Sequence, residues 1–413
     1  MEELRVYTVV LRVTFKMFPP FALFPRIHLA NVLFSTEEKG REPEAKRIPK
    51  VTLRKSTAQK SDEGCMPFMH LWRGFKALFK GKGRDRQKRL LYAHLIPGTI
   101  IGERFIIREL LGHGGGGKVY GAVDLDTGKQ LAVKMVVGKE MFSTLKTEYM
   151  VHRALRKAKN ITEGLTKIHY LGSYGDMYVM VMDRHGPSLE HLVKASGALK
   201  APDVLRIGLQ AIDRLENLHD RGYVHKDIKP ENMMMDLDTE QKLHLIDFGL
   251  TAKYKDKNGE HVPNVTSKFV GTVCFTSYHV DNSCVSVRRD DMESLMMVLA
   301  YMRRGCLPWS MMGTGGEYQG NVRQLLQDIW AAKESVTLEH LCKGMPQEFL
   351  EVMRYARGME FEERPNYEWM RMKFRDALSK LKEERELAQR EEDLLRKMEV
   401  WEKQKRVSGI KTW

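Results

Sequence analysis

Cysteine is scarce and scattered in this sequence, which limits what can hold the protein together. The 413 residues include five cysteines, an odd number with neither CxxC nor Cys/His ligand spacing. Neither a disulfide framework nor a structural zinc site is indicated, and we expect the thiols to be buried or idle. The positions are Cys65, Cys274, Cys284, Cys306 and Cys342.

Long apolar runs are also missing. The stretch from Val6 to Phe34 is apolar but is broken by charges and prolines, so it falls short of the ~18 residues that a membrane span needs. Glu2 and Glu3 lead the chain where a signal peptide has a basic start. Neither a membrane span nor secretion is predicted. With 42% hydrophobic and 30% charged residues, a globular protein of the cytoplasm or the nucleus is expected.

The net charge of +14 is concentrated near the N-terminus. Residues 1–98 carry 20 Lys and Arg against 9 Asp and Glu, which leaves a surplus of only 3 for the rest. The rest therefore gives no electrostatic evidence for nucleic-acid binding. Arg41 to Gly64 is polar and charged, the composition of a disordered linker. Residues 1–97 are predicted to be a basic, largely disordered extension.

A basic amphipathic helix is expected at 68–80 within this extension. Leu71, Phe75, Leu78 and Phe79 alternate there with lysine and arginine. Such a helix suits weak contact with an acidic membrane or protein surface. The favoured alternative is that its apolar side packs on the domain behind it. The basic cluster at 82–89 also has the composition of a nuclear address.

After Pro97 the pattern changes to strands and a glycine loop. ERFIIRELLGHGGGGKVYGAVDLDTGKQLAVKMV, residues 103–136, predicts a hairpin and a third strand. Gly112, Gly114, Gly117 and Val119 fit GxGxxGxV, in which backbone N–H groups approach phosphate oxygens and the valine covers a flat ring. Taken alone, the glycines describe a flexible turn equally well.

Two charged residues further along give this loop a chemical context. Lys134 lies on the next predicted strand, where its ammonium can reach the phosphates of a nucleotide under the glycine loop. Glu148 follows 14 residues later in a helical pattern, where its carboxylate can orient the lysine. Each residue alone could be an ordinary surface residue. Their order along the chain after the glycine loop is what indicates a nucleotide site.

The next segment reads as a strand, a hinge and two helices. The strand is expected at Met177–Met182, and a helix follows that is entered through Pro187 and Ser188. Backbone groups of Arg184 and His185 in the hinge are placed to bind an adenine edge. The side chain of His185 is interpreted as a solvated loop histidine. A second helix is expected over 201–218.

The stretch YVHKDIKPEN, residues 223–232, crowds groups suited to phosphoryl transfer. In that reaction an alcohol must be aimed at the γ-phosphorus while negative charge is balanced. Asp227 can accept the proton of the alcohol, Lys229 can neutralise the γ-phosphate, and Asn232 can ligate a metal. Asp247, in LHLIDFGL, supplies a second oxygen ligand suited to Mg²⁺.

These motifs, in this order, resemble the catalytic domain of eukaryotic protein kinases over about 98–380. More narrowly, the chain is similar to the casein kinase 1 family through VMVMDRHGPSLEHL, GTVCFTSYHV, RRDDMESL, LPW and LCKGMPQEF. That family lacks an APE motif, and so does this chain. The glycine run and the entry PGTIIGERF also resemble the tau-tubulin kinases, a branch of the same group.

The resemblance implies an α+β fold of two lobes, a small mostly β N-lobe at 98–183 and a larger mostly α C-lobe at 184–380. It implies a serine/threonine protein kinase that uses ATP and Mg²⁺ on protein substrates, and we expect a monomer. Asp227 is the catalytic base with Lys229 as its charge partner, Asn232 and Asp247 hold Mg²⁺, and Asp291 supports the catalytic loop from behind. The implied nucleotide-binding residues are Leu111, Gly112, His113, Gly114, Gly115, Gly116, Gly117, Lys118, Val119, Ala132, Lys134, Glu148 and Met182.

Four departures from the family pattern leave other interpretations open. Gly116 replaces the usual aromatic residue of the loop tip, and Lys226 replaces an arginine that often binds an activation-loop phosphate. Cys274 stands where relatives carry a basic residue, and the segment Met311 to Val322 lacks the lysines expected there. Together with the nearly neutral charge of the domain, this argues against phosphate-primed or strongly acidic substrates. One alternative is a pseudokinase that binds nucleotide or partners without turnover. Another is a nucleic-acid or membrane adaptor in which the basic extension is the functional part.

A charged helical tail is expected at 381–413. Opposite charges stand four residues apart in the pairs Glu386–Arg390, Glu392–Arg396 and Glu399–Lys403. The thin apolar stripe between them is too short and irregular to identify a coiled coil from sequence alone, which takes about 3 to 4 heptads. A solvated helix is predicted, with docking on the domain or on a partner as a further option.

Overall fold

The computed structural model describes residues 7–9, 32–34, 94–114, 116–156, 164–267, 269–282, 284–310, 312 and 322–407. Nearly all of the predicted extension, the helix expected at 68–80 and Gly115 lie outside the described residues. Two short strands of the extension, β1 (Tyr7–Val9) and β2 (Val32–Phe34), pair antiparallel. Within the described ranges, no helix is both long and apolar enough to cross a membrane.

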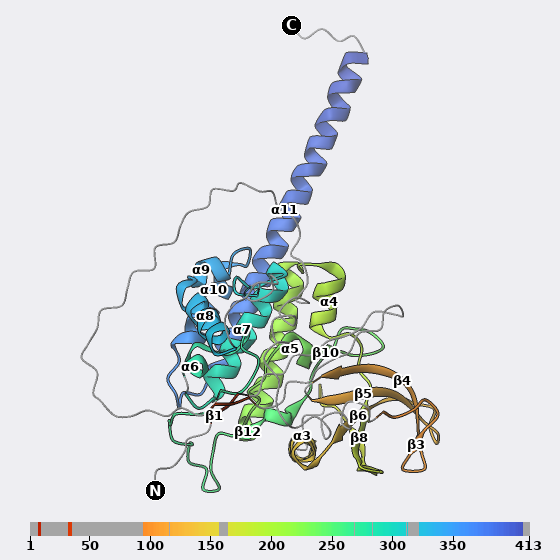
Figure 1. The fold of residues 1–413 in the computed structure, drawn as a ribbon. Helices are drawn as coiled ribbons and strands as arrows, with labels where there is room; N and C mark the ends of the chain where they lie inside the picture. The colour runs from red at the N-terminus through yellow and green to blue at the C-terminus, as the bar shows by residue number, and fades with distance from the viewer. Residues whose placement is uncertain are drawn as a thin grey trace, which may run out of the picture.

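A six-stranded sheet forms the smaller lobe, seen at the lower right of Figure 1. Its strand order is β3-β4-β5-β6-β8-β7, and every neighbouring pair is antiparallel. The predicted hairpin and third strand are β4, β5 and β6, and the strand predicted at 177–182 is β8. The bounds are β3 Ile100–Ile101, β4 Phe105–Gly114, β5 Gly117–Asp124, β6 Gln130–Val137, β7 Ile168–Tyr174 and β8 Met177–Asp183.

Both faces of the central strand β6 are covered. Leu131, Val133 and Met135 belong to one apolar cluster, whereas Ala132 and Val136 belong to another on the opposite face. This follows from the two-residue period of a strand. Helix α3 (Lys139–Arg156) lies against the second face. Lys134 shares that face, so its side chain points toward the helix that carries Glu148.

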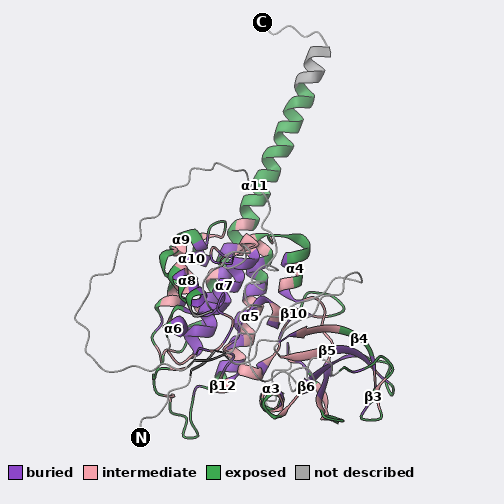
Figure 2. Ribbon diagram, viewed as in Figure 1, coloured by how far each residue is buried: buried purple, intermediate pink, exposed green. Residues whose placement is uncertain are grey.

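The larger lobe is mostly helical, as the two-lobed α+β prediction required. Helix α7 runs through its centre, and all residues from Arg288 to Met302 are buried, which appears as the purple helix of Figure 2. Ser188 caps α4 as predicted, and the helix expected over 201–218 continues to Asp220. The helices are α4 Leu189–Ser196, α5 Ala201–Asp220, α6 Tyr278–Asp281, α7 Arg288–Arg304, α8 Val322–Ser335, α9 Leu338–Leu341, α10 Gln347–Gly358 and α11 Tyr367–Val407.

Two small ladders support the loops between the lobes. Strand β9 (Tyr223–Val224) pairs with β12 (Ala252–Lys253), and β10 (Met233–Met235) pairs with β11 (Leu243–Leu245). The loop from β9 to β10 ends in the 3₁₀ turn η2 (Pro230–Asn232), and β11 leads into the turn η3 (Phe248–Leu250). The ladders therefore bring residues 225–232 and 246–250 to one place.

The tail predicted from residue 381 is the continuation of α11 rather than a separate element. The first part of this helix buries Tyr367, Met370 and Phe374 in the larger lobe. Beyond Leu381 it leaves the lobe and projects as a rod (Figures 1 and 2). The described side chains from Lys382 to Trp401 are exposed, which agrees with the solvated helix expected there.

The ion pairs predicted along the rod differ from those observed. Among its described side chains, Glu386 pairs with Lys382 at 3.9 Å, and the expected pairs Glu386–Arg390 and Glu392–Arg396 do not form. Exposed pairs gain little energy in water, so sequence spacing alone does not decide which of them close. The third expected pair includes Lys403, whose side chain lies outside the described residues.

Candidate active site

Lys134 and Glu148 meet across the face of the sheet. The lysine Nζ lies 2.6 Å from Glu148 Oε2 and 2.9 Å from Asp247 Oδ1. Both Lys134 and Glu148 are buried, and Leu145 and Leu155 anchor helix α3 beside them. Two carboxylates from distant parts of the chain thus hold one ammonium where water is largely excluded.

The glycine loop is the turn between β4 and β5. Gly117 has φ 111°, and a Cβ there would lie 2.3 Å from the carbonyl oxygen of Met135, so only glycine fits. A Cβ at Gly112 would meet no described atom within 4 Å. The backbone at Gly112 therefore borders open space, which suits the approach of a phosphate group. His113 pairs with Lys118 in the ladder, and Gly114 pairs with Gly117.

Apolar residues predicted to contact the nucleotide base are gathered below this loop. Ala132 and Met182 are partners in the β6–β8 ladder and are both 8% exposed. Leu111 and Val119, which are half-buried, pack against the same cluster. The four residues form one apolar surface beneath the strands of the glycine loop, which suits a flat ring.

The hinge after β8 is held by ion pairs. Lys129 Nζ lies 2.8 Å and His169 Nε2 2.9 Å from Asp183 Oδ1. Burial would raise the pKa of Asp183, but Lys129 and His169 outweigh it and lower the pKa to about 2. Arg184 donates to Glu109 in β4 at 2.7 Å, which joins the hinge to the glycine-loop strand.

The prediction of a solvated side chain at His185 is wrong. Its Nε2 lies 2.8 Å from Thr166 Oγ1, and its ring stacks on His244 with centroids 4.1 Å apart. Burial, aided by the neighbouring His244, lowers the pKa of His185 to about 4. The partners come from segments far along the chain, so local sequence offered no signal for this packing.

Asp227 lies at the centre of a hydrogen-bond network in the catalytic loop. Lys229 Nζ is 3.0 Å from its Oδ2, and the Thr272 hydroxyl donates to its Oδ1 at 2.7 Å. Lys229 also donates to Thr272 at 3.1 Å, which closes a triangle of three side chains. The amide of Asn232 donates to the Asp227 backbone carbonyl at 2.9 Å and to Oδ2 at 3.2 Å.

These contacts keep the two buried charges ionised. Burial would raise the pKa of Asp227, but the charge of Lys229 and the hydroxyl of Thr272 overcome it and hold the pKa below its usual value. Burial would lower the pKa of Lys229, yet Asp227 raises it instead. At neutral pH the site therefore holds a carboxylate, which is able to accept a proton, beside an ammonium.

The backbone before Asp227 adopts a conformation that is unusual for its residue. Lys226 has φ 71°, in the left-handed region that lysine seldom adopts. Asp291 holds it there by accepting hydrogen bonds from the N–H groups of His225 at 2.6 Å and Lys226 at 2.9 Å. The predicted support by Asp291 from behind is confirmed. Gly271 packs so closely that a Cβ would lie 2.8 Å from the Lys226 carbonyl oxygen.

Asp247 and Phe248 point to different sides of their turn. Asp247 has φ 61°, a left-handed conformation that aspartate tolerates better than most residues, and it reaches Lys134. The buried Phe248 ring lies 4.9 Å from the His152 ring on α3 and 5.3 Å from the His225 ring. Phe248 therefore links α3 to the catalytic loop.

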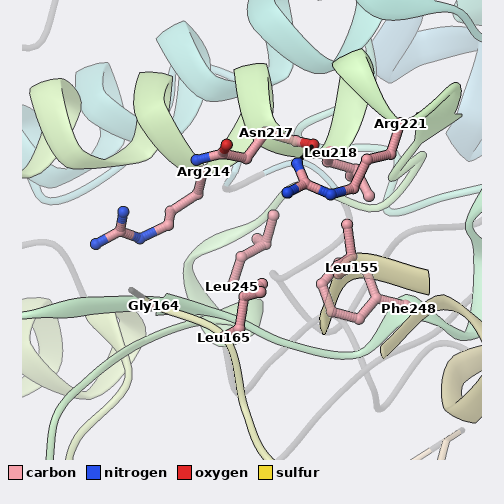
Figure 3. A pocket seen from close by; sticks show the side chains of 9 residues that line it. All are labelled: Leu155, Gly164, Leu165, Arg214, Asn217, Leu218, Arg221, Leu245 and Phe248. Atoms are coloured by element: carbon pink, nitrogen blue, oxygen red, sulfur yellow. Dashed lines mark hydrogen bonds between the residues drawn. The ribbon is translucent and has the colours of Figure 1, made fainter. Parts of the chain in front are cut away.

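A small pocket lies beside Phe248 (Figure 3). Leu155, Leu165 and Leu245 give it apolar walls, and side chains of α5 close it from the other side. The position of Phe248 is thus fixed by packing on α3, β11 and α5 together. The complete lining is Leu155, Gly164, Leu165, Arg214, Asn217, Leu218, Arg221, Leu245 and Phe248.

A buried lysine that the sequence analysis missed holds the segment after Thr272. Lys333 of α8 donates to the Thr276 carbonyl oxygen at 2.8 Å and lies 2.8 Å from Asp281 Oδ2. Burial raises the pKa of Asp281 to about 6, although Lys333 opposes the rise. No motif marks Lys333, because its partners lie more than 50 residues earlier in the chain. Thr272 stood in a quoted motif, but its role was also missed.

The predicted metal ligands have suitable chemistry. The amide nitrogen of Asn232 is engaged as a donor to Asp227, which leaves the oxygen as the atom with the character of a cation ligand. Asp247 is only partly buried and adds carboxylate oxygen. Within the described residues, no three His, Cys, Asp or Glu side chains gather as a metal site.

The fold and this site are those of a nucleotide-dependent phosphotransferase of two lobes. The family model described as protein kinase domain matches residues 105–411, about three quarters of the chain. The chain therefore belongs to the protein kinase family. Membership implies phosphate transfer to proteins with ATP, typically together with Mg²⁺.

Proposed function

We propose that this protein is a serine/threonine kinase of the casein kinase 1 type. The observation that carries the proposal is the position of Lys134, with its Nζ 2.6 Å from Glu148 and 2.9 Å from Asp247. Residues from β6, α3 and the turn after β11 thereby converge on one point under the glycine loop, as the ordered motifs require.

In the proposed reaction Asp227 accepts the proton of a serine or threonine hydroxyl. The oxygen of that hydroxyl forms a bond to the γ-phosphorus of ATP, and the bond from this phosphorus to the bridging oxygen breaks to release ADP. Lys229, 3.0 Å from Asp227, stabilises the charge on the phosphate being transferred. Thr272 contacts both residues and fixes their relative orientation.

The remaining groups bind and orient the nucleotide. Lys134 contacts the α- and β-phosphates while Glu148 orients it, and Val119, Ala132 and Met182 receive the base. Asn232 and Asp247 would hold Mg²⁺, which would supply positive charge to neutralise the phosphate oxygens. The roles of Leu111, His113 and Lys118 as neighbours of the nucleotide rest on their places in β4 and β5.

The proposal that serine and threonine are the phosphate acceptors rests on the sequence, and the position of Lys229 supports it. Lysine two residues after the catalytic aspartate is the form that resembles serine/threonine kinases. Lys229 is 1% exposed and is fixed by Asp227 and Thr272, so it is an integral part of the site. Cys274, where relatives carry a basic residue, is buried. We therefore propose substrates that carry no priming phosphate.

The proposal is tested with purified protein, Mg²⁺, radiolabelled ATP and casein. The natural protein should transfer phosphate to serine and threonine, as identified by phosphoamino-acid analysis, and Asp227→Asn should reduce transfer by at least about 100-fold. Asp238→Asn, an exposed change of the same type, is the matched control and should remain active. Nucleotide binding without transfer by the natural protein would favour the pseudokinase instead. Label on tyrosine would contradict the serine/threonine assignment.

A further inference from the structure

The rod formed by the end of α11 exposes large apolar side chains. Leu387 is 62% exposed, and Leu394 and Trp401 are each 60% exposed. In Figure 1 the rod runs straight away from the larger lobe. Figure 2 shows it exposed along its described length. Exposed apolar residues of this size in a regular series mark an interaction surface more often than chance.

The three residues recur with a spacing of seven. In an α-helix that spacing returns to nearly the same direction, with a drift of about 20° per repeat. Met398, four residues after Leu394, lies beside them on the helix surface. We call Leu387, Leu394, Met398 and Trp401 the rod seam.

The two halves of the rod carry opposite charge. Residues 382–393 contain six acidic and three basic side chains, whereas residues 394–406 contain two acidic and five basic ones. The net charge of the rod is therefore negative in the half nearer the catalytic domain and positive in the half toward its far end. Leu394 lies at the boundary between the two halves.

We propose that the rod pairs with the rod of a second copy of this chain, antiparallel and centred on Leu394. In that register Leu394 meets its own counterpart, and Leu387 of one copy faces Trp401 of the other. Glu391 of one copy comes level with Lys397 of the other, and each lies beside the seam because it is three residues from Leu394. The apolar seam and the charge pattern are therefore complementary to themselves in one arrangement.

A parallel pair fits less well. It would place the acidic half of one rod beside the acidic half of the other and the basic halves likewise, and like charges at such short range repel. The antiparallel pair also places the two catalytic domains at opposite ends of the paired rods, so that the domains do not collide. An acidic membrane is a poorer partner, because the half of the rod nearest the domain is itself acidic.

The first experiment measures the mass of the full chain by light scattering over roughly 1–100 µM, a range that spans weak dimers. The natural protein should change from monomer to dimer with concentration. Leu394→Glu should weaken the dimer at least about tenfold while leaving kinase activity at low concentration unchanged. The control is Val400→Glu, which also adds a carboxylate at an exposed apolar residue but lies off the seam, and it should still form dimers.

The second experiment tests the orientation by exchanging charges. Glu391→Lys is one variant, and Lys397→Glu is the other. Each variant alone should form a weaker dimer than the natural protein, and an equal mixture should recover the dimer because opposite charges again come level with each other. Circular dichroism checks that both variants keep the helix content of the natural protein.

Three results would count against the proposed dimer or its register. A natural protein that stays monomeric at the highest concentration overturns the proposal, as does a dimer that Leu394→Glu leaves intact. If the mixture does not recover the dimer, the antiparallel register is wrong. The mass measurements and the mixing experiment do not require the protein to be an active kinase.

Discussion

Lys134 and Glu148 stand 14 residues apart in sequence, on a strand and a helix, and their charged groups meet at 2.6 Å. Both side chains are almost completely buried, so neither charge has water as an alternative partner. Removing one member of a buried ion pair typically costs 3–5 kcal/mol, because the other member stays behind uncompensated. This pair therefore makes the nucleotide site sensitive to the position of helix α3.

Glu148→Gln should lower kcat/KM by about 100-fold or more. The glutamine keeps the shape of the side chain but removes the charge that opposes Lys134, so the ammonium loses its nearest carboxylate. Steady-state kinetics with varied ATP is the measurement. Glu140→Gln, an exposed change at the start of the same helix, is the matched control. Full activity in Glu148→Gln would show that the pair is dispensable.

Thr272→Val should reduce kcat and move the acidic limb of the pH–rate profile to higher pH. Valine preserves the shape but removes the hydroxyl that donates to Asp227 and accepts from Lys229. That hydroxyl helps to lower the pKa of Asp227, so its loss raises this pKa and protonates the base at a higher pH. Hydrogen bonds to charged groups contribute about 1.5–3 kcal/mol, equivalent to about 10- to 100-fold in rate.

A serine at the same position separates the hydroxyl from the methyl group. Thr272→Ser retains the donor and acceptor, so it should keep most of the activity and the natural pH profile. If valine and serine behave alike, the role assigned to the hydroxyl is wrong.

Features encoded by neighbouring residues were predictable from the sequence. The hairpin of β4 and β5, the strand β8 and the capped entry to α4 all follow from short patterns of apolar residues, glycine and serine. The order of Lys134, Glu148, Asp227 and Asp247 gave the site because their motifs are local, although the contacts between them are not. Local patterns cannot show that these four residues meet in one site. The resemblance to a known family predicted that they do.

Features that depend on distant packing were missed or misjudged. His185 looked like a solvated loop residue because Thr166 and His244 are brought to it only by the tertiary fold. Lys333 looked like any helix lysine, since its burial arises from residues on another element. In both cases the environment of a polar group, rather than its type, decides its role.

Lys333→Met should destabilise the fold and raise KM for protein substrate more than KM for ATP. The change leaves Asp281 and the Thr276 carbonyl buried without their cation, which typically costs about 3–5 kcal/mol. The segment that follows Thr272 then loses its anchor, while the contacts of Lys134 remain. Chemical denaturation and kinetics with each substrate varied are the measurements.

The double variant Lys333→Met with Asp281→Asn provides the control for this prediction. Removing both charges leaves no uncompensated ion, so the double variant should be more stable than Lys333→Met alone. Strict additivity of the two single changes would contradict a direct interaction between the residues.

Acidification should destabilise the protein through His152. Burial, together with the charge of Lys134, lowers the pKa of His152 to about 3, whereas an unfolded histidine has a pKa of about 6.5. Between these values the unfolded chain binds a proton that the folded chain does not. Stability is therefore unaffected by this group well above pH 6.5 and falls as the pH drops toward 3. From pH 6.5 to 4.5 the loss is about 2 kcal/mol.

Other groups act in the opposite direction, so a variant must isolate the histidine. Burial raises the pKa of Asp290 to about 7, and this carboxyl gains a proton in the folded state as the pH falls, which adds stability. His152→Gln removes only the histidine contribution and leaves Asp290 unchanged. Between pH 6.5 and 4.5 the variant should lose about 2 kcal/mol less than the natural protein, as measured by guanidinium denaturation at several pH values. Parallel curves for the two proteins would mean that His152 takes up its proton equally in both states, and that its burial against Phe248 does not control the acid stability of the fold.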